Sequence, residues 1–326
     1  MIEAVDLTKT YGPKTAVDHI SFTVEPGTVT GFLGPNGAGK STTMRLIMGL
    51  DRPTSGSVSV NGKPYNKLAA PLCDVGALLD AKGLHGSRSA RAHLTQLAVS
   101  NGIPRRRVDE VLELTGLTGV AKKRVKGFSL GMGQRLGIAA AMLGDPGVLI
   151  FDEPVNGLDP EGVKWVRETC RRLADEGRTV FISSHLMSEM AQTADHLLVI
   201  GRGRILTSGP VDEVIAASTT DRVRVASPQA SALAELLGRQ GIVTAPAGPS
   251  LLETTAATAA QVGEAAAAAG IVLHELTTVH ASLEDAYLTL TNGEVEYRTD
   301  GASPAAPAPA PAPAPAAMSP AEEGMK

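Results

Sequence analysis

Aromatic residues, cysteines and long apolar runs are all scarce in this sequence, and each shortage excludes a class of protein. Aromatic residues make up 3% of the 326 residues although hydrophobic residues reach 43%. The core must therefore be filled by Ala, Val, Leu and Ile, as in many layered α/β proteins. The two cysteines, Cys73 and Cys170, are far apart and form no CxxC pattern. This argues against a disulfide framework or a structural zinc site and fits a reducing compartment.

Apolar runs of membrane-spanning length are missing as well. No window holds about 18 consecutive apolar residues, and the Ala-rich stretch 255–270 is interrupted by Gln261 and Glu264. The first residues lack the basic segment, apolar stretch and cleavage site of a signal peptide. The formal net charge of -4 offers no general attraction to polyphosphate. We therefore expect a cytoplasmic chain that does not cross a membrane and whose main partner is not nucleic acid.

Short apolar runs bounded by Gly, Pro and Asp recur through residues 1–210. They are VTGFL before a Gly-rich loop, VLIF at 148–151, VFIS at 180–183 and LLVI at 197–200. Runs of this kind are typical of strands buried on both faces. Helical segments such as Glu161–Glu176 separate several of them, which predicts an α/β unit with a parallel or mixed sheet and crossover helices. Apolar residues near a 3.6 period predict a helical insertion at about 84–143.

The residues after Pro210 predict a smaller second unit at 211–295. Strands and helices alternate there in the order βαββαβ, which is typical of a ferredoxin-like α+β fold. The expected elements are Arg222–Ala226, Pro228–Arg239, Ile242–Ala245, Ser250–Thr254, Ala257–Ala268 and Ile271–Leu276. A helix capped by Ser282 follows, and the Pro/Ala-rich tail at 296–326 is expected to be disordered because it has little to bury.

One motif in the first unit carries strong chemical information. The segment from Gly34 to Ser41 satisfies G-x-x-x-x-G-K-[ST], and it follows an apolar run and precedes a helix-like segment. Glycines let consecutive backbone N–H groups converge on phosphates, and the helix N-terminus adds partial positive charge. Lys40 is predicted to neutralise the terminal phosphates, and the Ser41 hydroxyl is predicted to bind Mg²⁺. The sequence therefore predicts a nucleotide-binding P-loop.

Two adjacent carboxylates end the predicted strand at 148–151. Asp152 and Glu153 lie at the carboxyl edge of the sheet, beside the place where a phosphate loop lies in such folds. Phosphoryl transfer to water needs a positioned nucleophile and charge neutralised by a metal. We therefore predict that Asp152 holds Mg²⁺, through water, and that Glu153 orients and polarises the attacking water.

At these residues, and over about residues 1–210, the chain resembles the ATP-binding subunits of ABC transporters. FSLGMGQR at 128–135 resembles the family's signature segment, with Ser129 and Gly131 at its serine and at one glycine, while Leu130 and Met132 depart from the common LSGGQ wording. The segment from Asn156 to Asp159 follows the carboxylates as the family's D-loop does. His185, after TVFISS, stands at the switch histidine, and Tyr11 at the aromatic residue that stacks on adenine.

The resemblance implies a P-loop NTPase fold of the ABC ATPase type and a set of residue roles. Glu153, His185 and Lys40 are then catalytic, and Ser41 and Asp152 bind Mg²⁺. Ser129 and Gly131 grip ATP that is bound to the other subunit, in trans. The remaining ATP contacts are Tyr11, Gly34, Pro35, Asn36, Gly37, Ala38, Gly39, Lys40, Ser41 and Thr42.

One departure from the family concerns the Q-loop. VGALLD at 75–80 places Asp80 where the family usually has glutamine. A shorter, anionic side chain does not copy the contacts of glutamine with Mg²⁺ and water. Asp80 is therefore a further candidate for the metal, and its catalytic role stays open.

The segments VGALLD, FSLGMGQR and SLEDAYLTLT resemble those of efflux-type subunits of bacterial drug, antibiotic or lantibiotic exporters. The resemblance implies that two ATPase subunits, either a homodimer or a pair with a paralogue, sandwich ATP and drive a separate membrane permease. The chain would then lie on the inner face of the cell membrane. Two alternatives are a soluble ABC ATPase that acts on ribosomes or DNA and a P-loop kinase or GTPase. The single nucleotide cassette and net acidity disfavour the first, and the absence of an N-K-x-D motif disfavours a GTPase.

Overall fold

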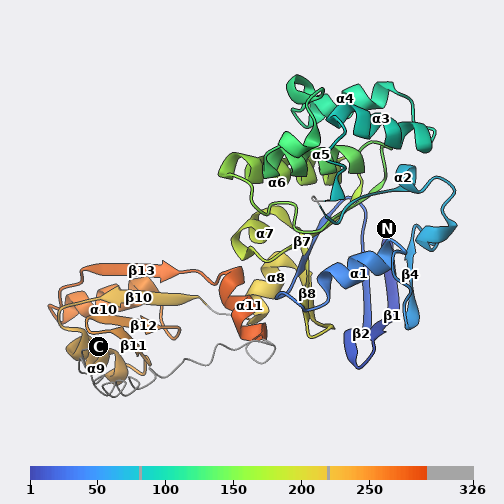
Figure 1. The fold of residues 1–326 in the computed structure, drawn as a ribbon. Coiled ribbons are helices and arrows are strands. Elements are labelled where there is room, and N and C mark those ends of the chain that lie inside the picture. The colour runs from blue at the N-terminus through green and yellow to red at the C-terminus, as the bar shows by residue number, and fades with distance from the viewer. Residues whose placement is uncertain (81–82, 219–220, 292–326) are drawn as a thin grey trace, which may run out of the picture. The chain divides into compact units, whose positions relative to one another are not determined.

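The computed structural model describes residues 1–80, 83–218 and 221–291 (Figure 1). Its main sheet has six strands in the order β5-β6-β7-β3-β8-β9. All neighbouring pairs are parallel except β8 and β9, which are antiparallel, so the sheet is mixed. The strands are β3 (Val29–Leu33), β5 (Val75–Leu78), β6 (Val148–Phe151), β7 (Thr179–Ser184), β8 (His196–Gly201) and β9 (Arg204–Pro210).

Three interior strands of this sheet are buried along their whole length, as their apolar runs predict. Every residue of β3, β6 and β7 is buried. The helices that accompany the sheet are α1 (Lys40–Ile47), α2 (Pro71–Asp74), α6 (Pro160–Asp175) and α7 (Met187–Thr193). Because the central strands are parallel, their carboxyl ends meet at one edge, and this edge carries the candidate site.

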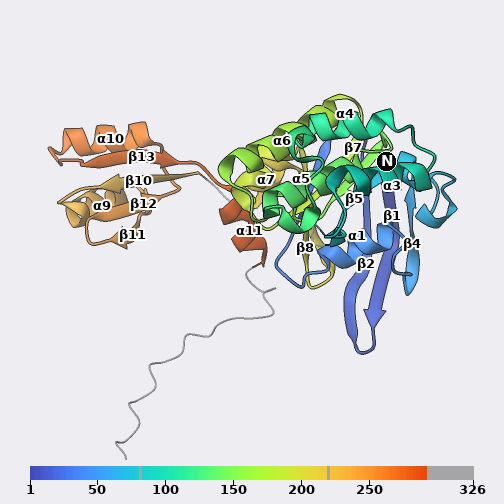
Figure 2. The same ribbon diagram turned by 45° about the horizontal axis from the view of Figure 1, so that its top comes forward.

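A second sheet, which the apolar runs do not predict, packs beside the first. It is antiparallel, with the order β2-β1-β4, and is formed by β1 (Ile2–Tyr11), β2 (Lys14–Val24) and β4 (Ser55–Val60) (Figure 2). Its strands mix buried with exposed residues, so they lack the continuous apolar signal of the main sheet. Phe22 of β2 joins the two sheets by stacking on Phe181, which in turn stacks on Phe32.

Helices occupy the chain between β5 and β6. The α-helices there are α3 (Ala90–Ser100), α4 (Arg106–Leu114) and α5 (Leu130–Ala141), and they pack on one another (Figure 1). Leu94, Leu112 and Leu136 are buried between them. Helix α5 also packs on β5. The close approach requires Gly137, because a Cβ atom there would lie 2.5 Å from Cδ1 of Leu78.

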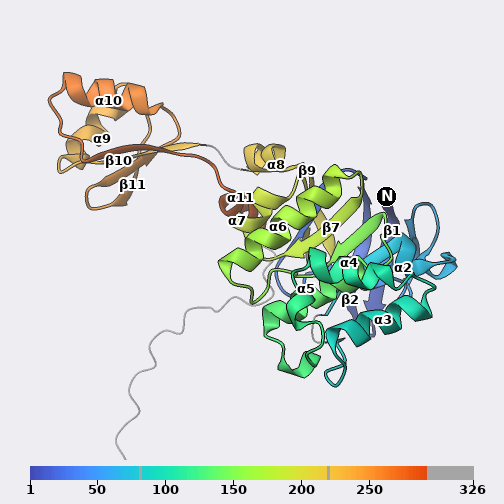
Figure 3. The same ribbon diagram turned by 90° about the horizontal axis from the view of Figure 1, so that it is seen from above.

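The C-terminal part of the described chain forms an antiparallel sheet with two helices. Its elements follow the order βαββαβ, and its strands are arranged β11-β12-β10-β13. The helices α9 and α10 cover one face of the sheet (Figure 3). The elements are β10 (Arg222–Ala226), α9 (Ala230–Arg239), β11 (Ala245–Gly248), β12 (Leu251–Thr254), α10 (Ala259–Ala268) and β13 (Glu275–Val279).

Two strands of this unit differ from the sequence prediction. Strand β11 begins at Ala245, where the prediction has the strand end, and β13 begins at Glu275 rather than at Ile271. The apolar residues that suggested the earlier positions follow helices: the N–H groups of Ile242 and Ile271 bond to Leu237 and Ala266 at the helix ends. Apolar residues thus close the helices instead of forming strands.

Two further helices flank this unit in the sequence. Helix α8 (Val211–Ser218) precedes it, and α11 (Leu283–Thr291) follows it. Helix α11 packs on α8 and on α7, and Leu283 and Ala286 are buried. Ser282 caps α11 as predicted, since its hydroxyl accepts the Asp285 N–H at 3.1 Å. The predicted disordered tail at 296–326 lies outside the described residues. None of the described helices has both the length and the apolar character needed to cross a bilayer.

Candidate active site

The Gly-rich loop lies between β3 and α1, as its sequence context predicts. Helix α1 begins at Lys40 with Gly39 as its N-cap, and no side chain caps its first turn. Gly39 has φ of 113°, and a Cβ atom there would lie 2.5 Å from the carbonyl oxygen of Ala16. Only glycine fits this position. The helix thus presents its first N–H groups and the positive end of its dipole, which suits an anion.

Lys40 is a buried cation at the base of this loop. Its side chain is 6% exposed, and its ammonium group donates to the carbonyl oxygens of Gly34 at 2.6 Å and Pro35 at 3.3 Å. Burial lowers the pKa of Lys40, while the nearby carboxylates of Glu153 and Asp152 act in the opposite direction. The ammonium nitrogen lies 3.7 Å from Oε1 of Glu153. The loop and the strand-end carboxylates therefore form one site.

Ser183 of β7 bonds to both acidic residues that follow β6. Its hydroxyl donates to Oδ1 of Asp152 at 2.5 Å and accepts the backbone N–H of Glu153 at 2.9 Å. Glu153 has a positive φ of 50°. Such a conformation is uncommon for a residue with a side chain and is often found at functional sites. The sequence motifs do not single out Ser183; its position at the end of the strand beside β6 is the signal that finds it.

His185 follows β7 and contacts Glu153. Its Nδ1 lies 2.7 Å from Oε2 of Glu153, and its side chain is half-exposed. One carboxylate oxygen of Glu153 therefore faces Lys40, and the other contacts His185. The structure thus brings together the three residues that the sequence predicts to be catalytic.

A cavity of about 400 Å³ adjoins the two carboxylates. Asp80, which follows β5, shares this cavity with Asp152 and Glu153 and so lies where a metal candidate should lie. The lining residues are Leu79, Asp80, Leu130, Gln134, Asp152, Glu153, Asn156 and Gly157. The end of the helical insertion and the strand-end carboxylates therefore face the same space.

Three other predicted site residues have different contacts. The Tyr11 hydroxyl donates to Asp51 at 2.9 Å, and the ring is 46% exposed. Ser129 caps α5 by accepting the N–H of Met132. A Cβ atom on Gly131 would lie 3.2 Å from Leu158 of the same chain. None of these contacts joins the residue to the P-loop, which is the expected result for Ser129 and Gly131 if they act in trans.

Comparisons with known proteins agree with this geometry. Residues 17–156 match the family model for ABC transporters. The chain is 36% identical over 295 residues to the uncharacterized ABC transporter ATP-binding protein YhcH of Bacillus subtilis, covering 89% of this chain and 96% of that protein. The chain belongs to the ATP-binding subunits of ABC transporters. This ABC subunit is accordingly an ATPase, and the fold and P-loop predicted from the sequence are those of its family.

Two further relatives of the ABC subunit bear on its function. It is 44% identical over 217 residues to the bacitracin transport ATP-binding protein BcrA of Bacillus licheniformis, covering 66% of this chain and 71% of that protein. It also resembles the structure of cbiO1 from Clostridium perfringens, described as part of the ABC transporter complex cbiONQ. That similarity has a TM-score of 0.59 and 27% identity and covers 74% of this chain and 95% of the other. Residues 221–284 match a domain of unknown function.

The donor set of the ABC subunit suits ATP with a magnesium ion. Among the residues that the structure describes, no group of three or more His, Cys, Asp and Glu side chains is arranged around a metal position. Magnesium does not need such a group, because it is usually held by one or two protein oxygens, waters and substrate phosphates. The Ser41 hydroxyl and the Asp152 carboxylate fit that pattern.

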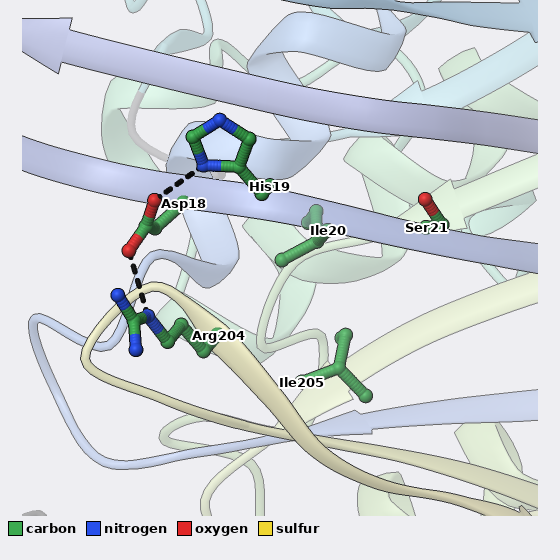
Figure 4. Close-up of a pocket in the computed structure, with 6 residues that line it drawn as sticks. All are labelled: Asp18, His19, Ile20, Ser21, Arg204 and Ile205. Carbon is green, nitrogen blue, oxygen red and sulfur yellow. Dashed lines mark hydrogen bonds and ion pairs between the residues drawn. The ribbon is translucent and has the colours of Figure 1, made fainter.

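A second hollow of the ABC subunit, of about 520 Å³, lies between β2 and β9 (Figure 4). Asp18 accepts from Arg204 at 2.7 Å and lies 2.7 Å from Nδ1 of His19. The hydrogen bond with Asp18 raises the pKa of His19, and that with His19 lowers the pKa of Asp18. These side chains pair with each other across an open surface, so they direct no unsatisfied group at a ligand.

Proposed function

We propose that this chain powers export of a drug, an antibiotic or another hydrophobic compound through a separate permease. Two ATPase subunits, two copies of this chain or this chain and a paralogue, sandwich two ATP molecules and close and reopen with each cycle. Closure depends on a difference in ATP affinity between the open and closed states, and hydrolysis resets it. The single observation that carries the proposal is the placement of Glu153 between Lys40 and His185 beside the P-loop.

The proposed roles follow from these contacts. Bound ATP and Mg²⁺ supply the phosphoryl group and the neutralising charge. Lys40 neutralises the terminal phosphates from the base of the loop. Glu153 orients and polarises the attacking water, and His185, at 2.7 Å from Glu153, holds that carboxylate in place and bonds the γ-phosphate. Asp152 and Ser41 would hold Mg²⁺, which would supply neutralising charge, and Ser183 fixes the orientation of Asp152.

The second subunit completes each site. Ser129 and Gly131 lie at the start of α5, where the helix dipole favours an anion. We propose that they contact the γ-phosphate of ATP bound to the other subunit. Tyr11 keeps a half-exposed ring at the end of β1, which supports stacking on adenine. The contacts within one chain are compatible with the roles of Ser129 and Gly131 in trans, because neither residue contacts the P-loop of its own subunit in them.

Export is supported by the bacitracin transport relative, and a permease partner is supported by the similarity to cbiO1 of the cbiONQ complex. The permease would hold the chain on the inner face of the cell membrane. We assign residues 1–210 to the ATPase domain, with 84–143 as its helical part, and 211–295 to an accessory domain. The strand order β11-β12-β10-β13 supports a ferredoxin-like fold for the latter.

The test uses the Glu153→Gln substitution. We expect the variant to bind ATP, to lose at least about a hundredfold in kcat and to accumulate as an ATP-bound dimer, because the polarising carboxylate is gone while the binding loop is intact. Size-exclusion chromatography with and without ATP measures the dimer. In cells, the wild-type chain expressed with its permease should lower accumulation of a peptide antibiotic, whereas Glu153→Gln should not.

The control is Glu168→Gln, on the exposed face of α6, which should leave turnover and transport unchanged. Wild-type turnover of the Glu153→Gln variant would refute the assigned role of Glu153. Equal antibiotic accumulation with the wild-type and Glu153→Gln chains would refute export.

A further inference from the structure

The cavity beside Asp152 and Glu153 is also lined by Gln134, a polar residue to which no role has been given. Gln134 of α5 lines this cavity together with the three carboxylates of Asp80, Asp152 and Glu153. An uncharged amide among them can donate to one group and accept from another. Gln134 is therefore suited to organising this space without adding charge.

The side chain of Gln134 is held in an unusual state. It is 6% exposed, and its Oε1 is buried and accepts no hydrogen bond from the described residues. Buried polar atoms in folded proteins are nearly always hydrogen-bonded, so an unpaired one calls for an explanation. Since the oxygen and nitrogen of an amide exchange places by a half-turn of the group, Gln134 can offer either end to the cavity.

The position of Gln134 follows from the packing of α5. Gly137 lies three residues further along the helix, on the same side, and allows α5 to approach β5 at Leu78. Strand β5 leads directly to Asp80. Helix and strand thus hold Gln134 near the carboxyl edge of the sheet, where Asp152 follows the neighbouring strand β6. The backbone packing of α5 on β5 therefore buries Gln134, so its side chain is not a flexible surface group.

We propose that Gln134 is a positioning residue for ATP hydrolysis in its own subunit, where its amide hydrogen-bonds the water that Glu153 polarises. The inference rests on the proposed function, and it extends that function to the helix α5 as a whole. The start of α5 carries Ser129, which serves the site of the other subunit. Gln134 follows five residues later, about 7.5 Å along the axis. One rigid helix thus serves both ATP sites, so opening of the dimer withdraws Ser129 and tilts Gln134 together.

The test compares Gln134→Met and Gln134→Glu in the full-length chain. Methionine keeps the length of the side chain and removes the amide, while glutamate keeps the shape and replaces the N–H group with an anionic oxygen. We expect both variants to lose about tenfold to a hundredfold in kcat, because a displaced reacting group is costly. The KM for ATP should stay within about twofold, because Gln134 does not bind the nucleotide. The melting temperature of Gln134→Met should not fall, since an unpaired buried oxygen is removed.

Gln96→Met is the control, because Gln96 lies on the exposed face of α3 in the same helical part. Its kcat should equal that of the wild type. Wild-type kcat in Gln134→Glu would overturn the proposal, as would a loss of activity in both variants that comes with a raised KM or a lowered melting temperature. The proposed function itself is tested separately with Glu153→Gln. Normal ATP turnover by that variant, or the absence of a trapped ATP-bound dimer, would contradict the proposed function and not the role of Gln134 alone.

Discussion

The ATPase part of the chain and its C-terminal α+β unit have cores of different kinds. The ATPase core contains the largest fully buried side chains, with Phe32 and Phe181 between the two sheets and Phe151 on the face that packs against helices. Residues 221–280 contain no aromatic residue, methionine or cysteine, and the core there consists of Val, Leu and Ala, with Ile at its edge. The core of the ATPase part is large enough that charged side chains can be buried at its edge. The second core supports a small sheet.

The comparison shows where a fold can carry strained or charged groups. Lys40 is buried, and Glu153 has a positive φ. Both cost stability, and both lie at the edge of strands that are buried on two faces. In the α+β unit, the charges of Arg224 and Glu253 pair on the face of the sheet opposite the one that α9 and α10 cover. Three substitutions, in order of expected effect, test this difference.

Phe181→Ala should have the largest effect. Phe181 is fully buried, with its ring centroid 5.2 Å from that of Phe32 and 6.0 Å from that of Phe22. Its removal leaves a cavity between two sheets, and we expect the free energy of unfolding to fall by about 3–5 kcal/mol. Denaturant unfolding measures the change. Val5→Ala, at a half-exposed position of β1, is the control and should change stability by less than about 0.5 kcal/mol.

Leu233→Ala should have a smaller effect that stays within the α+β unit. Leu233 of α9 is fully buried, and its truncation should cost about 2–3 kcal/mol, because small Ala and Val neighbours can close part of the cavity. Hydrogen exchange should quicken in α9 and β10 while kcat for ATP stays within about twofold. The exposed Val243→Ala in the same unit is the control. A large loss of ATPase activity in Leu233→Ala would show that the two cores are energetically one.

Arg224→Met should have the smallest effect. The guanidinium of Arg224 donates to Glu253 at 2.8 and 2.9 Å, but the side chain is 39% exposed. A pair at such a surface contributes less than about 1 kcal/mol. A double-mutant cycle with Glu253→Gln isolates this coupling, which salt should weaken. A coupling of several kcal/mol would mean that this face is covered in the working protein.

Much of the main sheet could be predicted from the sequence, since strands buried on both faces leave continuous apolar runs. VTGFL and VLIF coincide with β3 and β6. The antiparallel sheet of β1, β2 and β4 could not be found in this way, because its strands mix exposed with buried residues. Strands β11 and β13 are displaced from their predicted positions because apolar residues after a helix can close its last turn as well as begin a strand.

The candidate site was predictable where a residue belongs to a motif with its own chemistry. Lys40, Glu153 and His185 belong to such motifs, and the structure places them in contact. Ser183 belongs to no motif, and Gln134 lies within FSLGMGQR at a position to which the motif assigned no role. Their importance depends on which strand lies beside β6 and on how closely α5 approaches β5. Such distances between elements are a property of the fold and leave no mark in the local sequence.

The contact between α8 and α11 makes the α+β unit an insertion rather than an appended tail. The chain leaves the ATPase part through α8, forms the unit, and returns through α11, which packs on both α8 and α7. Helix α7 begins two residues after His185. A domain insertion whose first and last residues lie close together can be exchanged for another domain without disrupting the fold of the protein that carries it. Two helices, α8 and α11, therefore join the unit to the rest of the described chain, and α11 also contacts the helix that follows His185.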